Sequence, residues 1–509
     1  MTRPWYLDAV FYQVSTRAFY DSDGDGWGDF RGLIAKLDYV RGLGADCIWL
    51  MPHYVSPLRD DGYDVADYYA VNPRLGTLDD FRALVEECHG RGLRIIADLV
   101  LNHVSSDHAW FREARRDPAS PHRGWFVWSQ TGAEYPDAPV IFPEVKTSNW
   151  TFDETAGMYY WHRFFPHQPD LNYDDPAVGE AMLRVARFWL ELGVDGFRVD
   201  AVPYLYERAG TTCENLAETH AFCRRLRAVL DADFPDAVLL CESNQPYETL
   251  LPYLDREFHL GFHFPLMPRI WVALAAERAR PVWESLRDRP ELPAGSGLVT
   301  FLRNHDDLTL EKVTAAEREL LLRRYHRGVG HLVNGGIPRR LAPLVAGDPR
   351  QIELLHALVL GLDQPVCLYY GDEIGMGDDP SLDDRFGVRT PMQWSDAPQA
   401  GFSTAAETCL PVVDDPDFSY RRVNVERAMA DPESFYHRLR RLIARRKASP
   451  ALRHGRLELL HEPAAELLAF RRVAQEETVV AVYNFCERAS RSAVIDEEIP
   501  AYGYRWSLT

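Results

Sequence analysis

The amino-acid sequence predicts an α/β protein built on a closed (β/α)8 barrel, or TIM barrel, with an inserted small domain after the third strand and a short C-terminal β domain. Short runs of β-branched or aromatic residues alternate with segments of helical spacing, which is typical of parallel sheets. Eight such runs are present, the number of strands that closes this kind of barrel. Carboxylates and histidines follow several runs directly, at the strand ends where barrel enzymes carry their chemistry.

The predicted strands all lie in the first 370 residues. They are Val10–Val14, Cys47–Met51, Leu93–Leu99, Gly196–Val199, Val238–Cys241, Leu260–Phe264, Leu298–Phe301 and Val366–Tyr370. The helix before the fourth strand has the clearest boundaries. Asp175 is a typical N-cap, Pro176 suits the first helical position, and Gly193 ends the apolar pattern.

Two parts of the chain do not fit a plain barrel. About 70 residues, rich in proline and tryptophan, separate the third strand from the helix at Pro176, which is too long for a barrel loop. We therefore predict an inserted domain over 104–175 and a barrel over 1–103 and 176–449. Beyond 449 the helical pattern gives way to short runs such as Glu477–Tyr483, which predicts a C-terminal β domain over 450–509.

Composition narrows the class of protein. The chain has 509 residues, 46% of them hydrophobic, enough for a large core. A net charge of −20 argues against nucleic acids and anionic membranes as partners. The N-terminal residues lack the apolar segment of a secretion signal, and the eight cysteines lie mostly in apolar runs, so we expect a cytoplasmic protein. A disulfide between Cys213 and Cys223 is the one alternative, and the oligomeric state is not fixed by the sequence.

Acidic and basic side chains gather at the ends of four predicted strands. His103 follows the third strand, Arg198 and Asp200 end the fourth, Glu242 follows the fifth, and His305 and Asp306 follow the seventh. A single acid after a strand is usually a cap or a loop residue. Together these groups match what glycosidic cleavage requires: one carboxylate at the anomeric carbon, another to protonate the leaving oxygen, and donors for sugar hydroxyls.

These segments resemble the hallmark motifs of the α-amylase superfamily of glycoside hydrolases, and Gln168-Pro-Asp170-Leu-Asn172 resembles its fifth motif. The resemblance extends from Trp5 to about Lys447. It implies a retaining mechanism with Asp200 as nucleophile, Glu242 as general acid/base and Asp306 as the third carboxylate. It also implies that Arg198 keeps Asp200 ionised by lowering its pKa. The sugar hydroxyls would be bound by Tyr63, Asp64, His103, Gln168 and His305.

Two calcium sites are predicted, both structural. The loop Asp21-Ser-Asp23-Gly-Asp25-Gly-Trp27-Gly-Asp29 places an acid at nearly every second position, which suits calcium, and glycines allow a tight wrap. It is not an EF-hand, because Gly32 stands where the bidentate glutamate belongs. Resemblance to oligo-1,6-glucosidase-like members adds the Trp27 carbonyl as a ligand. The alternative is a solvated acidic turn.

The second calcium site is implied by the resemblance alone. It joins Asn102 and Asp170, with help from oxygens near Tyr204, Leu205 and Glu207. The alternative is a hydrogen bond between the asparagine and the aspartate.

Finer segments resemble the trehalose synthase branch of the superfamily. They include Cys213-Glu-Asn215-Leu, Tyr370-Gly-Asp-Glu-Ile-Gly-Met376-Gly and Gly387-Val-Arg389-Thr-Pro-Met-Gln-Trp394. The resemblance implies a small α-glucoside such as maltose or trehalose as substrate and partner, and a glucosyl-Asp200 intermediate. It also implies that the freed glucose is retained, with Arg385 as the clamp on this second sugar.

The chain also departs from that branch. Asp307 stands where the branch usually has glutamate, and both the segment Ser243–Glu257 and the C-terminal domain are short. Tyr204 and Glu311 are the expected partners of Asp307. Because aspartate is one methylene shorter than glutamate, we expect any hydrogen bond to them to be longer or lost. An α-glucosidase, or an α-glucosyltransferase with another acceptor, is therefore the alternative. A non-catalytic binding relative is disfavoured because the three carboxylates are complete.

Overall fold

The computed structural model describes residues 3–508 and closes eight parallel strands into one barrel. Each strand overlaps a predicted one, with ends that differ by at most two residues, so the predicted fold class is confirmed. The order around the barrel is β1-β13-β12-β11-β10-β9-β5-β2. The bounds are β1 Val10–Val14, β2 Cys47–Leu50, β5 Arg94–Val100, β9 Gly196–Asp200, β10 Val238–Cys241, β11 Leu260–Phe262, β12 Gly297–Phe301 and β13 Val366–Tyr369.

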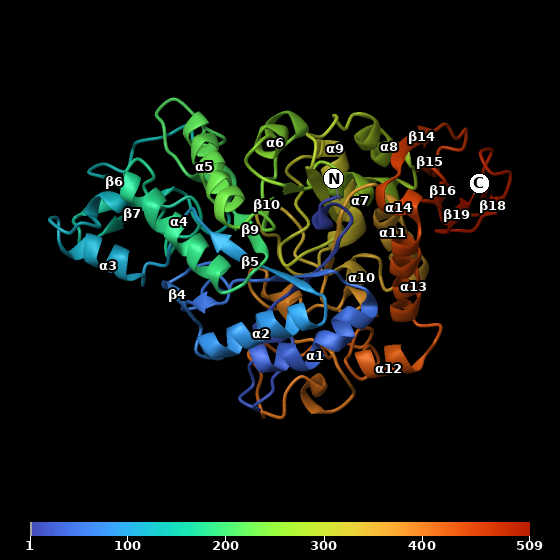
Figure 1. The fold of residues 1–509 in the computed structure, drawn as a ribbon, viewed down its shortest axis with the longest axis horizontal. Helices are drawn as coiled ribbons and strands as arrows, with labels where there is room; N and C mark the ends of the chain where they lie inside the picture. The colour runs from blue at the N-terminus through green and yellow to red at the C-terminus, as the bar shows by residue number, and fades with distance from the viewer. Residues whose placement is uncertain (1–2, 509) are drawn as a thin grey trace.

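Helices cover the outside of the barrel (Figure 1), which explains why its strands read as continuous apolar runs. They are α1 Phe30–Leu43, α2 Leu78–Gly90, α4 Pro176–Glu191, α5 Ala217–Asp233, α6 Tyr247–Leu254, α7 Met267–Ala276, α8 Arg280–Arg287, α9 Ala315–Leu321, α10 Leu341–Leu344, α11 Pro349–Gly361, α12 Val425–Ala430 and α13 Phe435–Ala448. The predicted N-cap of α4 is present, since the Asp175 side chain accepts from the amide of Ala177. Its apolar stripe, with Val178 and Trp189 fully buried, packs toward the barrel.

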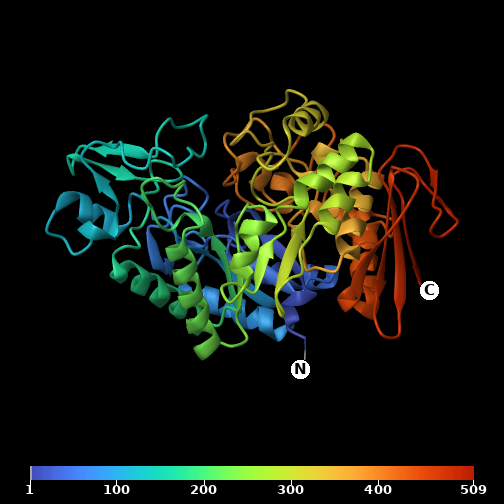
Figure 2. The same ribbon diagram turned by 90° about the horizontal axis from the view of Figure 1, so that it is seen from above.

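The long connection after β5 forms a lobe at one end of the molecule, opposite the C-terminal strands (Figures 1 and 2). It contains α3 (Ala109–Arg116) and an antiparallel sheet of β6 (Trp128–Ser129), β8 (Met158–Trp161) and β7 (Trp150–Asp153). Trp150 and Trp161 form its small apolar core with Ala138 and Cys213. Two of the segment's tryptophans thus form its own core, whereas Trp110, Trp125 and Trp128 belong to or pack against the main core.

The C-terminal strands form an antiparallel sheet that packs against the barrel helix α11. Its order is β14 (Arg456–Leu460), β15 (Leu467–Val473), β16 (Thr478–Asn484) and β19 (Tyr504–Leu508), and it follows the short helix α14 (Pro450–His454). Two short strands, β17 (Ser490–Arg491) and β18 (Glu498–Ile499), pair beside it. Tyr483 donates to the carbonyl of Ala357 in α11, and a Cβ at Gly361 would overlap the Tyr483 hydroxyl. Glycine is needed there for the close approach.

All eight cysteines are free thiols, so the alternative of a disulfide between Cys213 and Cys223 is wrong. Both are buried, in different surroundings: Cys213 in the core of the inserted lobe and Cys223 in the main core. Within residues 3–508, no helix combines the length and the apolar character needed to span a membrane.

Candidate active site

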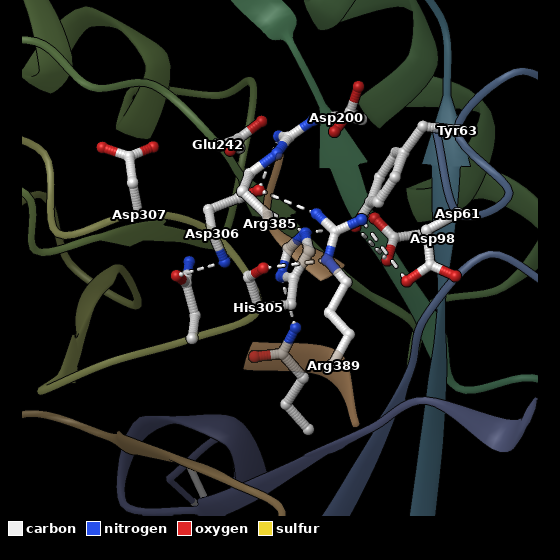
Figure 3. A network of polar contacts seen from close by, with 12 residues as sticks. Asp61, Tyr63, Asp98, Asp200, Glu242, His305, Asp306, Asp307, Arg385 and Arg389 are labelled. Carbon is white, nitrogen blue, oxygen red and sulfur yellow. Dashed lines mark hydrogen bonds and ion pairs between the residues drawn. The ribbon is translucent and has the colours of Figure 1, made fainter. Parts of the chain in front are cut away.

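The acidic groups predicted from strand ends meet at the carboxyl end of the barrel (Figure 3). Glu242 and Asp306 line one cavity of about 150 Å³, together with Tyr204, Asp307 and Arg385. Drug-sized pockets are about 300–1,000 Å³, so this cavity suits a small ligand. Asp200 is linked to it through a shared arginine.

Arg198 pairs with three carboxylates from three strands. Its Nη1 lies 2.5 Å from Asp98 Oδ1 and 2.6 Å from Asp200 Oδ1, and its Nη2 lies 2.8 Å from Glu242 Oε1. Asp98 faces Arg198 because their strands, β5 and β9, pair in that register. Asp98 was not among the predicted site residues. In the sequence, Asp98 is recognisable as an acidic residue within a mostly apolar strand.

Burial dominates the pKa values of the two carboxyls proposed for catalysis. It raises the pKa of Asp200 to about 6 although Arg198 opposes the shift. It raises the pKa of Glu242 to about 7, again against Arg198 and with help from the charges of Asp200 and Asp306. Arg198 thus lowers the pKa of Asp200 as expected, but desolvation is larger than the attraction of one guanidinium shared among three acids, and the net shift is upward.

Asp306 lies in the opposite electrostatic environment. Burial alone would raise its pKa, but the guanidinium groups of Arg385 and Arg389 hold it well below its usual range. Its Oδ1 lies 2.7 Å from Arg385 Nη1 and 3.2 Å from Arg389 Nη2. The other nitrogen of Arg385, Nη2, lies 2.7 Å from Asp60 Oδ1. Arg385, predicted as a clamp on the second sugar, is thus bound on both sides by carboxylates and still lines the cavity.

His305 is fixed by contacts to both ring nitrogens. Its Nδ1 lies 2.6 Å from Gln13 Nε2, and its Nε2 lies 2.7 Å from the Tyr63 hydroxyl, while the Tyr63 and His305 rings stack at 5.4 Å. Burial holds the pKa of His305 well below its usual value, so it is neutral. His103 is also buried, its pKa is lowered to about 3 by burial, and its Nε2 has no partner within residues 3–508.

Two residues predicted to bind sugar, Gln168 and Asp64, make hydrogen bonds with the loop that carries Asp60. Gln168 donates from Nε2 to Asp60 Oδ2 at 2.9 Å and is itself fully buried. Asp64 accepts from the Ser56 hydroxyl and from the amides of Arg59 and Asp60. The Asp64 carboxylate therefore closes this turn, because buried amides need an acceptor, and Asp64 is not among the residues that line the cavity.

Asp60, like Asp98, was not among the predicted site residues. The available signal was the acid pair Asp60-Asp61 directly before Gly62, which has a φ of +101° and stands next to Tyr63.

The cavity rim holds the residues expected around Asp307, in a different arrangement. In the described part of the chain, the Asp307 carboxylate makes no hydrogen bond with Tyr204 or Glu311, the two partners for which a longer or lost contact was expected. Glu311 accepts instead from Asn244 Nδ2 at 2.7 Å and from Asn334 Nδ2 at 2.6 Å. Burial raises the pKa of Asp307 to about 7.

The acidic loop before α1 brings three of its aspartates together. One oxygen each of Asp21, Asp23 and Asp29 lies within 4.8 Å of the others, so the group could bind a metal ion. Asp21 and Asp29 are buried, and Asp23 is exposed. Asp25 is outside this group, and its Oδ1 accepts from the amide of Trp27 at 2.8 Å. The sequence-predicted ligand set is therefore only partly assembled here.

The second predicted metal site contains buried oxygens that lack partners. Asn102 Oδ1, Asp170 Oδ2 and Glu207 Oε1 are inaccessible and have no hydrogen-bond partner within residues 3–508. Burial raises the pKa of Asp170 to about 7 and that of Glu207 well above its usual range, and the two charges oppose each other. Tyr204 and Leu205 belong to the turn just before Glu207. Unpaired buried oxygens are costly, and a cation would relieve that cost.

Comparison with known proteins places these features in a family. The family description "Alpha amylase, catalytic domain" matches residues 13–325 and 338–455. The trehalose synthase/amylase TreS of Mycobacterium tuberculosis is 51% identical over 491 residues, covering 94% of this chain and 82% of that protein. A trehalose synthase of Pimelobacter is 49% identical over 467 residues, with 89% and 82% covered.

Solved structures of other carbohydrate-active enzymes are also similar to this chain. The alpha-glucosyl transfer enzyme XgtA superposes with a TM-score of 0.79 at 31% identity, covering 96% of this chain and 92% of that one. The trehalulose synthase MutB of Pseudomonas mesoacidophila superposes with a TM-score of 0.81 at 27% identity, covering 100% and 98%.

Proposed function

The chain belongs to the alpha-amylase family, and we propose that it is a retaining trehalose synthase that interconverts maltose and trehalose. The observation that carries this proposal is the set of three carboxyl groups in three electrostatic environments at one end of the barrel. About half of the residues are identical with proteins named trehalose synthase over nearly the whole chain, which supports this substrate pair.

The proposed reaction proceeds in two displacements at one anomeric carbon. An oxygen of Asp200 attacks C1 of the terminal glucose of maltose, while Glu242 gives its proton to the departing glycosidic oxygen. The freed glucose turns within the closed site. Its anomeric hydroxyl then attacks C1 of glucosyl-Asp200, Glu242 takes the hydroxyl proton, and the ester bond to Asp200 breaks. The product is trehalose, and both carboxyls return to their first state.

The surrounding groups suit these roles. A carboxyl with a pKa of about 7 still carries its proton near neutral pH, as the acid Glu242 must. Asp200, with a pKa of about 6, is mostly ionised there, as a nucleophile must be. Asp306 is held as a carboxylate by cations on either side and accepts hydrogen bonds from ring hydroxyls. The Tyr63 hydroxyl and the neutral His305 are further partners for that ring.

A cavity rim that limits the access of water favours transfer to the freed glucose over hydrolysis. Phe142 and Phe164 line the cavity from the inserted lobe, and Glu311 joins Asn244 to Asn334 across the rim. Closing a site in this way keeps water from a reactive intermediate. The rim therefore supports the isomerase over the α-glucosidase.

Product analysis tests the proposal. Pure enzyme is incubated with maltose and the products are separated, with the Asp200→Asn variant as the blank. Trehalose as main product is expected. Glucose alone would identify an α-glucosidase, new glucosides with added alcohols would identify another glucosyltransferase, and no change in maltose would contradict an enzyme of this substrate class.

The pH profile of kcat/KM for maltose should be bell-shaped, with its maximum between about pH 6 and about pH 7. Activity falls below pH 6 as Asp200 gains a proton, and falls above pH 7 as Glu242 loses one, because their pKa values are about 6 and about 7. Initial rates in buffers of constant ionic strength provide the check. A rate that stays level well above pH 7 would argue against Glu242 as the acid.

The Asp307→Glu variant should release less glucose relative to trehalose than the wild type. The longer side chain can reach a partner across the rim, where Asp307 now makes no hydrogen bond to Tyr204 or Glu311. One hydrogen bond of about 1 kcal/mol changes the partition about fivefold. The exposed Asp417→Glu is the matched control. Equal glucose fractions in all three proteins would show that position 307 does not set the outcome.

We further propose that calcium binds both predicted sites and acts structurally. Asp21, Asp23 and Asp29 would hold one ion, and Asn102, Asp170 and Glu207 the other, where it would neutralise acids otherwise left to repel. The support is the chemistry of the donors, which are all oxygens, and the unpartnered oxygens of the second set.

Removing calcium should lower the melting temperature. An ion present at a hundredfold excess over its Kd adds about 2.7 kcal/mol to the folded state. Melting with chelator and with added calcium is compared for wild type, Asp23→Asn and Asp170→Asn, each variant expected to lose part of the calcium response. Asp25→Asn is the control for the loop, since Asp25 is outside the group of three. An identical transition with and without chelator in the wild type would instead indicate a solvated acidic turn.

A further inference from the structure

A second cavity, of about 560 Å³, lies behind one wall of the proposed active site. Neighbouring residues line the two cavities: Arg385 lines the active-site cavity, and Phe386 lines the second one. We call it the Arg17 cavity, after its buried residue. Its lining includes Arg17, Trp27, Leu58, Arg74, Phe386 and Leu410.

Two guanidinium groups of this cavity have unused donors. Arg17 is only 7% exposed, and its Nε lies 2.5 Å from Asp61 Oδ1, yet its Nη2 has no hydrogen-bond partner among residues 3–508. Arg74 is exposed, forms no ion pair within that range, and lies 4.8 Å over the ring of Trp27. A buried guanidinium with a spare donor is costly unless an acceptor is near, and the matching acceptor is a carboxylate or a phosphate.

The remaining walls are apolar. The Trp27 and Phe386 rings both lie against the Arg17 guanidinium, at 5.9 and 5.5 Å, and Leu58 and Leu410 also line the cavity. Such walls suit a ring or a short hydrocarbon body, and the arginines suit a negative group attached to it. A site of this kind stands out in a chain with 76 acidic and 56 basic residues.

We propose that the Arg17 cavity binds a small organic anion, a carboxylate or phosphate ester on an apolar body, and that its occupancy changes sugar binding at Asp306. A chain of ion pairs connects the two sites. Asp61 forms an ion pair with Arg17 through Oδ1, and its Oδ2 lies 3.3 Å from Arg389 Nη1. Arg389 in turn lies 3.2 Å from Asp306 (Figure 3).

The turn that carries Asp61 is held in an unusual conformation. Asp61 has a φ of +51°, rare for a residue other than glycine, and its side chain is 1% exposed. Such a backbone persists only where its surroundings impose it, here the arginines on either side. An anion bound to Arg17 competes with Asp61 for the guanidinium and weakens the Arg17–Asp61 ion pair. Asp61 then attracts Arg389 more strongly, and the ion pair between Arg389 and Asp306 becomes weaker. The effect on Asp306 rests on its proposed role in binding the sugar.

Binding is tested on the full chain by calorimetry, with phenyl phosphate and benzoate as probes at constant ionic strength. Saturable binding is expected. Arg74→Gln should weaken it about tenfold, the loss of one charge-assisted contact of about 1.4 kcal/mol. The matched control is Arg116→Gln, which removes the same charge from an exposed helix position and should leave the affinity unchanged. Absence of saturable binding, or equal weakening by both variants, would overturn the proposal.

The probes also separate the possible sources of the anion. Binding of phenyl phosphate alone would assign the site to phosphate esters, and binding of benzoate alone to carboxylates. Inorganic phosphate, which lacks an apolar body, should bind more weakly than phenyl phosphate. Equal affinity for these two would contradict the role given to the apolar walls.

Kinetics tests the connection to Asp306. With phenyl phosphate at about its wild-type Kd, KM for maltose should change more in the wild type and in Arg116→Gln than in Arg74→Gln, and at full saturation it should change about fivefold or more in all three. An unchanged KM in spite of demonstrated binding would overturn the coupling. Binding of phenyl phosphate by an enzyme that does not convert maltose would support the anion site and refute the proposed function instead.

Discussion

Replacing Asp200 by asparagine is expected to lower kcat/KM for maltose on the order of 10⁴-fold or more while the protein stays folded. The amide is nearly the same size but cannot form the covalent bond to C1. Glu242→Gln should be as damaging with maltose, because its leaving alcohol needs a proton. The rates of trehalose and glucose formation from maltose measure the activity of both variants, and circular dichroism checks that they are folded.

The two carboxyls can be told apart with a substrate whose leaving group needs no proton. With 4-nitrophenyl α-glucoside, Glu242→Gln should still release one equivalent of nitrophenol and then accumulate the glucosyl-enzyme, visible as a mass increase of one glucosyl unit. Asp200→Asn should show neither. Azide, a nucleophile that needs no base, should restore turnover of the Glu242→Gln intermediate. Near wild-type activity of an Asp200→Ala enzyme would refute the assignment of the nucleophile.

Replacing Arg198 by methionine should destabilise the protein by about 3–5 kcal/mol as well as inactivate it, because it leaves buried charge without a partner. One guanidinium is shared by Asp98, Asp200 and Glu242, and its side chain is 1% exposed. Without it the pKa values of these acids rise further above their unfolded values. Groups with raised pKa values favour the folded state at low pH, so the deficit should be small near pH 5 and grow toward pH 8.

Thermal and urea unfolding at several pH values measure this effect. Arg198→Lys, which keeps the charge but not the forked geometry, should fall between wild type and Arg198→Met. The matched control is Arg225→Gln, whose pair with Glu180 is about half exposed on both sides and should change stability by less than about 1 kcal/mol. A deficit of Arg198→Met that is equal at all pH values would indicate lost packing rather than unpaired charge.

The barrel and its strand-end acids were predictable because their signals are local. Each barrel strand is buried on both faces, so it reads as a short apolar run, and the fifth strand, Val238–Cys241, was predicted to the residue. The acids Asp200 and Glu242 follow such runs directly, and parallel strands bring their carboxyl ends to one rim. That rim was therefore determined by the sequence before any tertiary contact was known.

The partners and charges of the side chains were decided by the tertiary structure. Asp64 and Asp60 are close in sequence, but only the packed loop turns Asp64 inward to its amides and Asp60 toward Arg385. The pKa of Asp200 moves upward because burial removes water, and burial is set by strands and helices far away in the chain. The Arg17 cavity likewise joins segments hundreds of residues apart. The periodicity of apolar residues indicates which face of a helix or strand is buried. The desolvation and the ion pairs of a side chain depend on which other elements pack against that face, and a local sequence pattern does not contain this information.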